Sequence, residues 1–238
     1  MTWSILAREC NGHVGVAIAS RFFCVGSLCV HTRRGVGAIA TQALMNPLYG
    51  QAGLDLLAQG RPASEVITTL VAGDDGREQR QLHVLPMYGA GAAHTGAECV
   101  DWCGHLLRDG FSVAGNMLAG ARVIEATAEA FAASRAPTMA ERLLDAMDAG
   151  ERAGGDKRGK QSAAVRIHTD EDYLALDLRV DDHADPLPEL RRLHAVSLER
   201  FQPFVSCLPG RGRPCGVTDR PTIEATIERF HAARRALA

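Results

Sequence analysis

Thr2 is the residue whose type and place in the chain point most directly to chemistry. It follows Met1, and a small second residue normally permits removal of the initiator methionine. A threonine with a free α-amine carries a nucleophile and a general base on one residue, because that amine has an ordinary pKa of about 8 and can take the hydroxyl proton near neutral pH. Small residues are common at this position, so Thr2 alone is a weak indication of catalysis.

A glycine-rich loop at residues 154–162 comes closest to a phosphate-binding motif. It reads Gly-Gly-Asp-Lys-Arg-Gly-Lys-Gln-Ser, with Gln161 where the pattern needs Ser or Thr for a metal ion. A helix is expected before the loop and a strand after it, so no helix N-terminus would face a phosphate. Phosphate binding through Lys160 stays open as a minor alternative.

Two cysteines with two nearby histidines are the candidates for metal ligation. Cys99 and Cys103 have His94 and His105 beside them in sequence. A single Cys-x3-Cys spacing without a second pair is a weak indication of zinc, and buried free thiols are the commoner outcome. We therefore expect no metal and no cofactor.

The segments that must position these residues alternate between strand and helix patterns. Thr2 opens a predicted strand over 2–8, which Asn11-Gly12 joins to a second strand over 13–20, since this dipeptide suits a tight hairpin turn. We expect further strands at 35–41, within 80–95, at 162–168 and at 173–180, and helices at 50–59, 63–72, 123–133, 139–149 and 222–237. Strands in adjacent pairs favour antiparallel sheets, so the fold class is α+β with layered sheets and helices.

Composition excludes several classes of function. The 238 residues are 46% hydrophobic and carry a formal net charge of −2, so no basic excess supports nucleic-acid binding. No apolar stretch reaches the ~18 residues of a membrane span. The cysteine count is odd, at seven, and the N-terminus does not read as an export signal. We expect reduced thiols and a cytoplasmic protein.

The composition of the sequence changes near residue 195, after which proline and glycine become frequent. We expect a domain over 1–195, followed by a Pro- and Gly-rich connector and an amphipathic C-terminal helix over 196–238. That helix either packs on its own domain or joins two subunits, so a homo-oligomer formed through it is an open alternative.

Four longer segments carry a resemblance to a known family. They are 41–50 (Thr-Gln-Ala-Leu-Met-Asn-Pro-Leu-Tyr-Gly), 110–120 (Gly-Phe-Ser-Val-Ala-Gly-Asn-Met-Leu-Ala-Gly), 154–163 and 177–183 (Asp-Leu-Arg-Val-Asp-Asp-His). With these in order, the chain from residue 1 to about 195 resembles the DUF1028 family, placed in the N-terminal nucleophile (Ntn) hydrolase superfamily. The resemblance implies a four-layer αββα sandwich of two antiparallel sheets, with the nucleophile opening a central strand. Enzymes of that superfamily cleave amide bonds through an acyl-enzyme.

The resemblance also implies catalytic roles for single residues. Thr2 would be the nucleophile and base. Arg34, or its neighbour Arg33, falls near where proteasome-like members keep a lysine, and could act there only through its charge. Where those members place an aspartate, this chain has Ala19 followed by Ser20. Asn116 is the candidate oxyanion donor, with capping of a following helix as the alternative.

Substrate binding has candidates of its own. Arg158 and Lys160 could bind a substrate carboxylate with Asp156 orienting them, the alternative being a solvated charged loop. Asn46 is a further candidate, although with Tyr49 it more readily shapes a turn and a helix start. The leading hypothesis is a hydrolase of an amide or peptide-like small molecule with Thr2 exposed by removal of Met1. The alternative is a non-catalytic member of the same fold that binds a small ligand or a protein.

Overall fold

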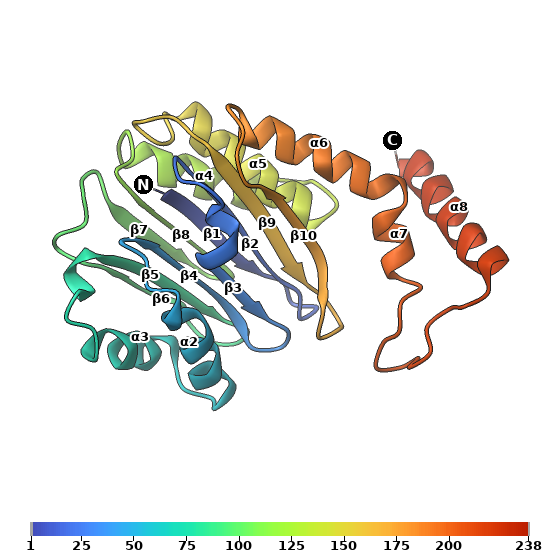
Figure 1. The fold of residues 1–238 in the computed structure, drawn as a ribbon, viewed down its shortest axis with the longest axis horizontal. Helices are drawn as coiled ribbons and strands as arrows, with labels where there is room; N and C mark the ends of the chain where they lie inside the picture. Colours follow the sequence, from blue (N-terminus) through green and yellow to red (C-terminus); the bar gives the residue numbers. More distant parts are fainter. Residues whose placement is uncertain (1, 238) are drawn as a thin grey trace. The chain divides into compact units, whose positions relative to one another are not determined.

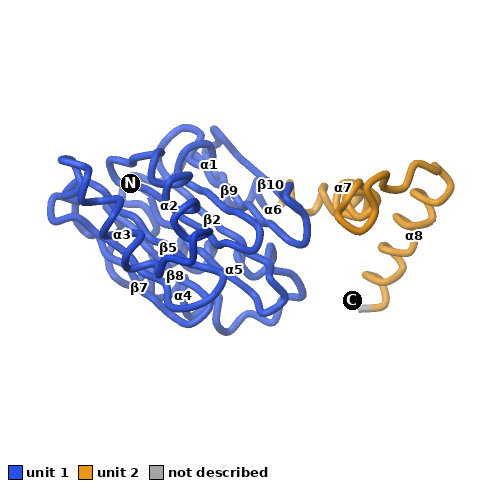
Figure 2. Tube along the Cα trace, turned by 90° about the horizontal axis from the view of Figure 1, so that it is seen from below, with its two compact units in different colours: residues 1–190 blue, residues 191–238 orange. Residues whose placement is uncertain are grey.

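The computed structural model describes residues 2–237. The chain divides into two compact units, residues 1–190 and 191–238 (Figure 2), and each is described by itself. All of the secondary structure that surrounds Thr2 belongs to the first unit.

The first sheet places the N-terminal strand at its centre. Its six antiparallel strands run in the order β10-β9-β2-β1-β8-β7. Their bounds are β1 Thr2–Arg8, β2 Val14–Ser20, β7 Gly104–Arg108, β8 Phe111–Asn116, β9 Ser162–His168 and β10 Leu174–Val180. Because β1 lies between β2 and β8, Thr2 has a strand neighbour on each side.

The second sheet packs face to face with the first. It has four antiparallel strands in the order β3-β4-β5-β6. Their bounds are β3 Val30–Arg33, β4 Gly37–Ala43, β5 Arg80–Pro86 and β6 Ala92–Thr95. Leu6, Val16 and Ile18 of the first sheet join Ala40 and Leu85 of the second in one buried apolar cluster. Burial of these side chains holds the two sheets together.

Helices cover the outer face of each sheet (Figure 1). The pair α4 Arg122–Ala133 and α5 Met139–Arg152 lies on the first sheet, and the pair α2 Leu48–Ala58 and α3 Ala63–Ala72 lies on the second. The other helical segments of the first unit are α1 Val25–Leu28, η1 Arg77–Gln79 and the start of α6 Pro186–Glu199. The α+β fold with four αββα layers is therefore confirmed.

The second unit contains the end of α6 and two further helices, α7 Phe201–Val205 and α8 Arg220–Leu237. Arg200 forms an ion pair with Glu224 across α7 and α8, and Ile227 of α8 is buried. Across residues 2–237, none of the helices is long and apolar enough to cross a membrane.

Candidate functional site

Three polar residues form a row across the first sheet at the start of β1. Asn116 of β8 and Ser20 of β2 are the direct strand partners of Thr2. Residues directly opposite each other project from the same face of a sheet, so the three side chains share the face toward the second sheet. The Thr2 Oγ1 and Ser20 Oγ atoms lie 3.1 Å apart. Thr2 is only 5% exposed, so its hydroxyl is largely shielded from water.

Three buried amide side chains connect this row to the second sheet, and we call Gln42, Gln81 and Asn116 the amide cluster. The Gln81 Oε1 atom accepts from Gln42 Nε2 at 2.7 Å and from Asn116 Nδ2 at 3.1 Å. Both donors also approach the carbonyl oxygen of Thr2, at 3.4 Å each. Gln81 Nε2 in turn donates to the carbonyl of Gly115 on β8. The Thr2 backbone is thus contacted by Gln42 from the second sheet and by Asn116 from the neighbouring strand β8.

A buried histidine continues these hydrogen bonds into the core. Ser4 Oγ donates to Gln42 Oε1 at 2.7 Å and lies 2.8 Å from His83 Nε2. Since the one Ser4 hydroxyl hydrogen goes to Gln42, His83 Nε2 is the protonated nitrogen, and Nδ1 accepts from Ser112 Oγ at 2.8 Å. Burial, and less so the charge of His105, lowers the pKa of His83 to about 3. His83 is therefore neutral at pH 7.

Asp156 brings a carboxylate next to the start of β1. Its Oδ2 accepts from the backbone N–H of Arg21 at 3.1 Å, and its Oδ1 from the N–H of Arg158 at 2.8 Å. Asp156 also forms a backbone bridge with Leu118. Arg21 and Leu118 follow Ser20 and Asn116, the two partners of Thr2. Burial raises the pKa of this carboxyl, against the hydrogen bonds from the two amides, which lower it.

The neighbouring basic residues differ in their freedom to bind a substrate. Lys160 Nζ lies 2.8 Å from Glu151 and 2.6 Å from Asp185. Burial alone would lower the pKa of Lys160, but hydrogen bonds to Asp185 and Glu151 raise it. Arg158 has a side chain 44% exposed and 3.7 Å from Asp156. Lys160 thus joins the loop to the ends of α5 and α6, whereas Arg158 faces solvent beside Asp156.

The glycine-rich loop uses its backbone amides within the protein. The N–H groups that donate to protein oxygens are those of Gly154, Gly155, Arg158, Gly159 and Gln161. A phosphate-binding loop needs such groups directed at the ligand. The loop is also preceded by α5 and followed by β9, as expected. Both observations count against phosphate binding here.

Asn46 and Tyr49 lie in a separate polar cluster around Asp74. Asn46 Oδ1 accepts from the N–H of Leu48 at the start of α2, and its Nδ2 donates to Asp74 at 3.0 Å. Tyr49 donates to the same carboxylate at 2.6 Å, and Arg80 at 3.0 Å. Asn46 has no hydrogen bond to Thr2 or to the amide cluster among those found in residues 2–237. Its contacts are those of a helix start.

Arg34 lies at the far end of the second sheet from the amide cluster. It belongs to the turn before Gly37, the first residue of β4, whereas Gln42 lies near the end of that strand. Five residues of extended strand span about 17 Å. The structure therefore does not bring Arg34 together with Thr2, and we leave it out of the site.

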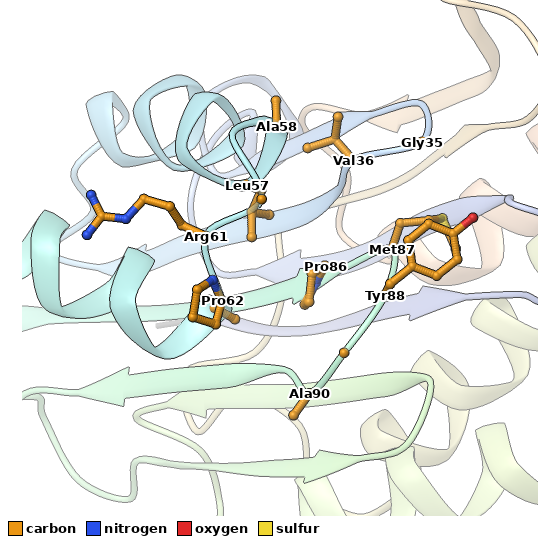
Figure 3. A pocket seen from close by; sticks show the side chains of 13 residues that line it. Gly35, Val36, Leu57, Ala58, Arg61, Pro62, Pro86, Met87, Tyr88 and Ala90 are labelled. Atoms are coloured by element: carbon orange, nitrogen blue, oxygen red, sulfur yellow. The ribbon is translucent and has the colours of Figure 1, made fainter.

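Two cavities border the second sheet. One has a volume of about 450 Å³, and we call it the Asn116 cavity. Its lining includes Asn116, the next residue Met117, and Ala43, which follows Gln42. The other, of about 530 Å³, lies between the α2–α3 connection and residues 86–90 (Figure 3). Its lining includes Gly35 and Val36 at the Arg34 end of the second sheet. The larger cavity thus lies away from Thr2, and we place the candidate site at the Asn116 cavity.

The candidate metal ligands make other contacts within the protein. Cys99 Sγ donates to the carbonyl of Arg80, and Cys103 Sγ to that of Cys99. His105 Nδ1 lies 2.9 Å from the Thr95 hydroxyl. Among residues 2–237, no group of three or more His, Cys, Asp or Glu side chains could hold a metal ion.

The fold and the site together define a two-sheet αββα protein whose N-terminal strand begins in a buried polar row. The family model described as "Family of unknown function (DUF1028)" matches residues 2–190, and the chain belongs to that family. The crystal structure of protein SPO2555 from Silicibacter pomeroyi, of the same family, is 30% identical with a TM-score of 0.85, covering 92% of this chain and 99% of that one. Anbu (ancestral beta-subunit) from Yersinia bercovieri is 13% identical with a TM-score of 0.39, covering 82% and 94%. None of the curated proteins matches the sequence.

Sequence reasoning missed most of the residues that surround Thr2. Gln42 lies inside the segment 41–50, but neither it nor Gln81, Ser4 or His83 is among the residues that the sequence predicts for the site. The usable signal was the presence of polar residues within otherwise apolar strands, such as Gln81 and His83 in β5. Buried polar groups need partners, so such positions predict a polar network between the sheets.

Proposed function

We propose that the protein is an Ntn-type hydrolase that cleaves an amide bond in a small molecule, with Thr2 as nucleophile after removal of Met1. One observation carries the proposal: the row Ser20–Thr2–Asn116 sets the Thr2 hydroxyl at the start of a central strand, between a hydroxyl and an amide. Met1 lies outside the described residues. The seven cysteines are all free, which suits the reducing cytoplasm that we propose as the location.

The proposed reaction has two steps. Thr2 Oγ1 attacks the amide carbonyl while its proton passes to the Thr2 α-amine, and the protonated amine then gives that proton to the departing nitrogen. An ester between Thr2 and the acyl group remains. Water attacks this ester with the same amine as base, which releases the acid and restores Thr2. Ser20 Oγ, 3.1 Å from the nucleophile, orients the hydroxyl.

Asn116 is the proposed donor to the oxyanion. Its Nδ2 has contacts to Gln81 at 3.1 Å and to the Thr2 carbonyl at 3.4 Å. The second is long for a hydrogen bond, so that hydrogen is the one to redirect toward a developing charge. A single donor of this kind contributes about 10²–10³ in rate in a hydrolase. Gln81 keeps the amide in place through its own bond.

Asp156 is the proposed carboxylate partner of the α-amine, since position 19 is alanine in this chain. Asp156 contacts Arg21, which follows Ser20, and pairs with Leu118, two residues after Asn116, so it lies beside the end of the sheet at which Thr2 opens β1. We propose that Asp156 orients the amine, and that Arg158 remains a candidate for the substrate.

The experiment is hydrolysis by protein whose N-terminus has been verified as Thr2. We expect activity within a panel of N-acyl amino acids, lactams and short peptides, loss of that activity in Thr2→Ala, and partial retention in Thr2→Ser, which keeps a hydroxyl. Thr2→Ala should keep the circular dichroism spectrum of the parent. Equal turnover by Thr2→Ala would refute the proposal.

A non-catalytic binding role is the second candidate function. It is favoured by the hydrogen bonds that the Asn116 side chain already makes within the protein. Both contacts of its Nδ2 are within the protein, and Thr2 is nearly inaccessible. A binding protein of this kind would show a ligand-dependent rise in melting temperature with no product formed. Product formation that depends on Thr2 decides between the two candidates.

A further inference from the structure

The Asn116 cavity has an apolar lining with a carboxylate among its residues. It lies between the end of β4, the end of β8 and the loop that joins β6 to β7. The residues that line it are Ala43, Leu44, Gln79, Glu98, Cys99, Val100, Asn116 and Met117. Leu44 and Val100 are more than half exposed, at 57% and 58%, so apolar side chains face solvent at the cavity.

One residue, Asn116, is common to the cavity and to the row that contains the proposed nucleophile. Asn116 lines the cavity and is also the direct strand partner of Thr2. Ala43 and Met117, which follow Gln42 and Asn116, both have positive φ angles, of 65° and 54°. Such angles are uncommon without glycine and cost energy unless the surroundings impose them, which is typical of binding and active sites. Each positive φ thus lies directly after a buried amide residue, at the end of β4 and just beyond β8.

The loop that closes the cavity is anchored to both sheets. The N–H of Glu98 donates to the carbonyl of Glu78, and the N–H of Met117 donates to the carbonyl of Val100. Cys99 Sγ donates to the carbonyl of Arg80. A pocket held by such bonds is largely preformed, and its volume of about 450 Å³ lies within the range of small-molecule sites.

The charge of the lining is negative. Glu98 accepts from Gln79 Nε2 at 2.9 Å, and no Lys, Arg or His is among the lining residues of the described chain. Outside the lining, the Arg80 guanidinium donates to the carbonyl of the lining residue Leu44, and its charge is paired with Asp74 at 3.0 Å. Lys157 donates to the carbonyl of Asp101. An anionic group in this cavity would meet the Glu98 carboxylate, and the adjacent Arg80 is already neutralised by Asp74, whereas an aliphatic group would bury apolar surface.

We infer that the Asn116 cavity binds the acyl part of the substrate and selects uncharged aliphatic acyl groups. This inference rests on the proposed function of Thr2 and names the substrate class of the same site: amides of uncharged aliphatic acids. The acyl carbon bonds to Thr2 Oγ1 while its chain enters the cavity.

A series of β-lactones that differ in the alkyl substituent next to the carbonyl tests the inference. Thr2 Oγ1 attacks the lactone carbonyl, the ring C–O bond breaks, and the proton from Thr2 passes through the α-amine to the released alkoxide. The product is an ester on Thr2 with no leaving group. The rate of adduct formation, followed by intact mass and peptide mapping of protein that begins at Thr2, measures the fit of each chain.

The rate constant should rise by up to about fourfold per added methylene until the cavity is full. A lactone whose chain ends in a carboxylate should react at least about tenfold more slowly than the uncharged chain of equal length, and Glu98→Gln should reduce that difference. Val100→Trp should remove the advantage of long chains by filling the cavity. Leu107→Trp, at an exposed position on β7 outside the cavity, is the matched control and should keep it.

Two results would overturn the inference, and they are distinguishable. Adducts on Thr2 at rates that ignore chain length, or that favour the carboxylate, would refute the acyl preference and leave the nucleophile standing. No adduct on Thr2 with any lactone would refute the proposed function, and the inference with it.

Discussion

Replacing Gln81 with methionine tests the amide cluster, because methionine has similar length and no strong hydrogen-bonding atoms. Gln81 Oε1 accepts from Gln42 and Asn116, and Gln81 Nε2 donates to Thr95 and to the carbonyls of Gly104 and Gly115. Gln81→Met removes all of these partners at once. The site is fully buried, so water cannot readily replace them.

The expected cost follows from the buried donors that lose their acceptor. Gln42 Nε2 and Asn116 Nδ2 keep only the 3.4 Å contacts to the Thr2 carbonyl. A buried polar group left without a partner costs about 1–3 kcal/mol, so the two together predict a loss of about 3 kcal/mol in the free energy of unfolding. For a domain of this size that is a fall of about 6–12 °C in melting temperature.

Urea denaturation followed by circular dichroism measures this loss. The matched control is Gln51→Met on the exposed face of α2, where the glutamine has one bond to Asp55. The control should stay within about 0.5 kcal/mol of the parent. A loss below about 1 kcal/mol for Gln81→Met, or one equal to the control, would refute the view that the amide cluster holds the sheets together here.

Three further predictions concern charge. Burial lowers the pKa of His83 to about 3, so below pH 6.5 the unfolded chain binds more protons than the folded one. The free energy of unfolding should therefore fall toward pH 3 by up to about 1.4 kcal/mol per pH unit. His83→Gln should reduce that slope, measured by urea titrations at a series of pH values. Hydrogen bonds from Arg80 and Tyr49 hold the pKa of Asp74 well below its usual range, so its carboxylate stabilises the fold above about pH 4. Asp74→Asn should lower the free energy of unfolding at neutral pH, and the same titrations should show a smaller difference from the parent as the pH falls below about 4. Lys160→Met should lower the melting temperature, because both ion pairs are lost, and leave the KM for hydrolysis unchanged; a raised KM would instead assign Lys160 to substrate binding.

The longer elements of the fold were predictable from periodicity. The strand expected at 2–8 is β1 Thr2–Arg8, and the helix expected at 63–72 is α3 Ala63–Ala72. The strand β3 was missed because its four residues include only one that is buried, so it has no clear apolar pattern. The helix α6 was missed because Pro186 and Pro188 look like breaks, although proline is well tolerated in the first turn of a helix.

Thr2, Asn116 and Asp156 were predictable as single residues of the site, but their arrangement was not. Thr2 and Asn116 are 114 positions apart in sequence, and their pairing depends on strand register, which no local pattern specifies. Asp156 was expected to orient Arg158 and Lys160, whereas its carboxylate accepts backbone N–H groups beside the start of β1. These contacts join segments next to β2, β8 and β9, so they form only when the strands of the first sheet have paired.

The N-terminal residue of active, native protein tests the central claim most directly. We predict that intact-mass measurement and N-terminal sequencing of a preparation that hydrolyses an amide substrate find a chain that begins at Thr2, because the reaction needs the α-amine on the same residue as the hydroxyl. Full activity in a preparation whose chains retain Met1 would contradict the account.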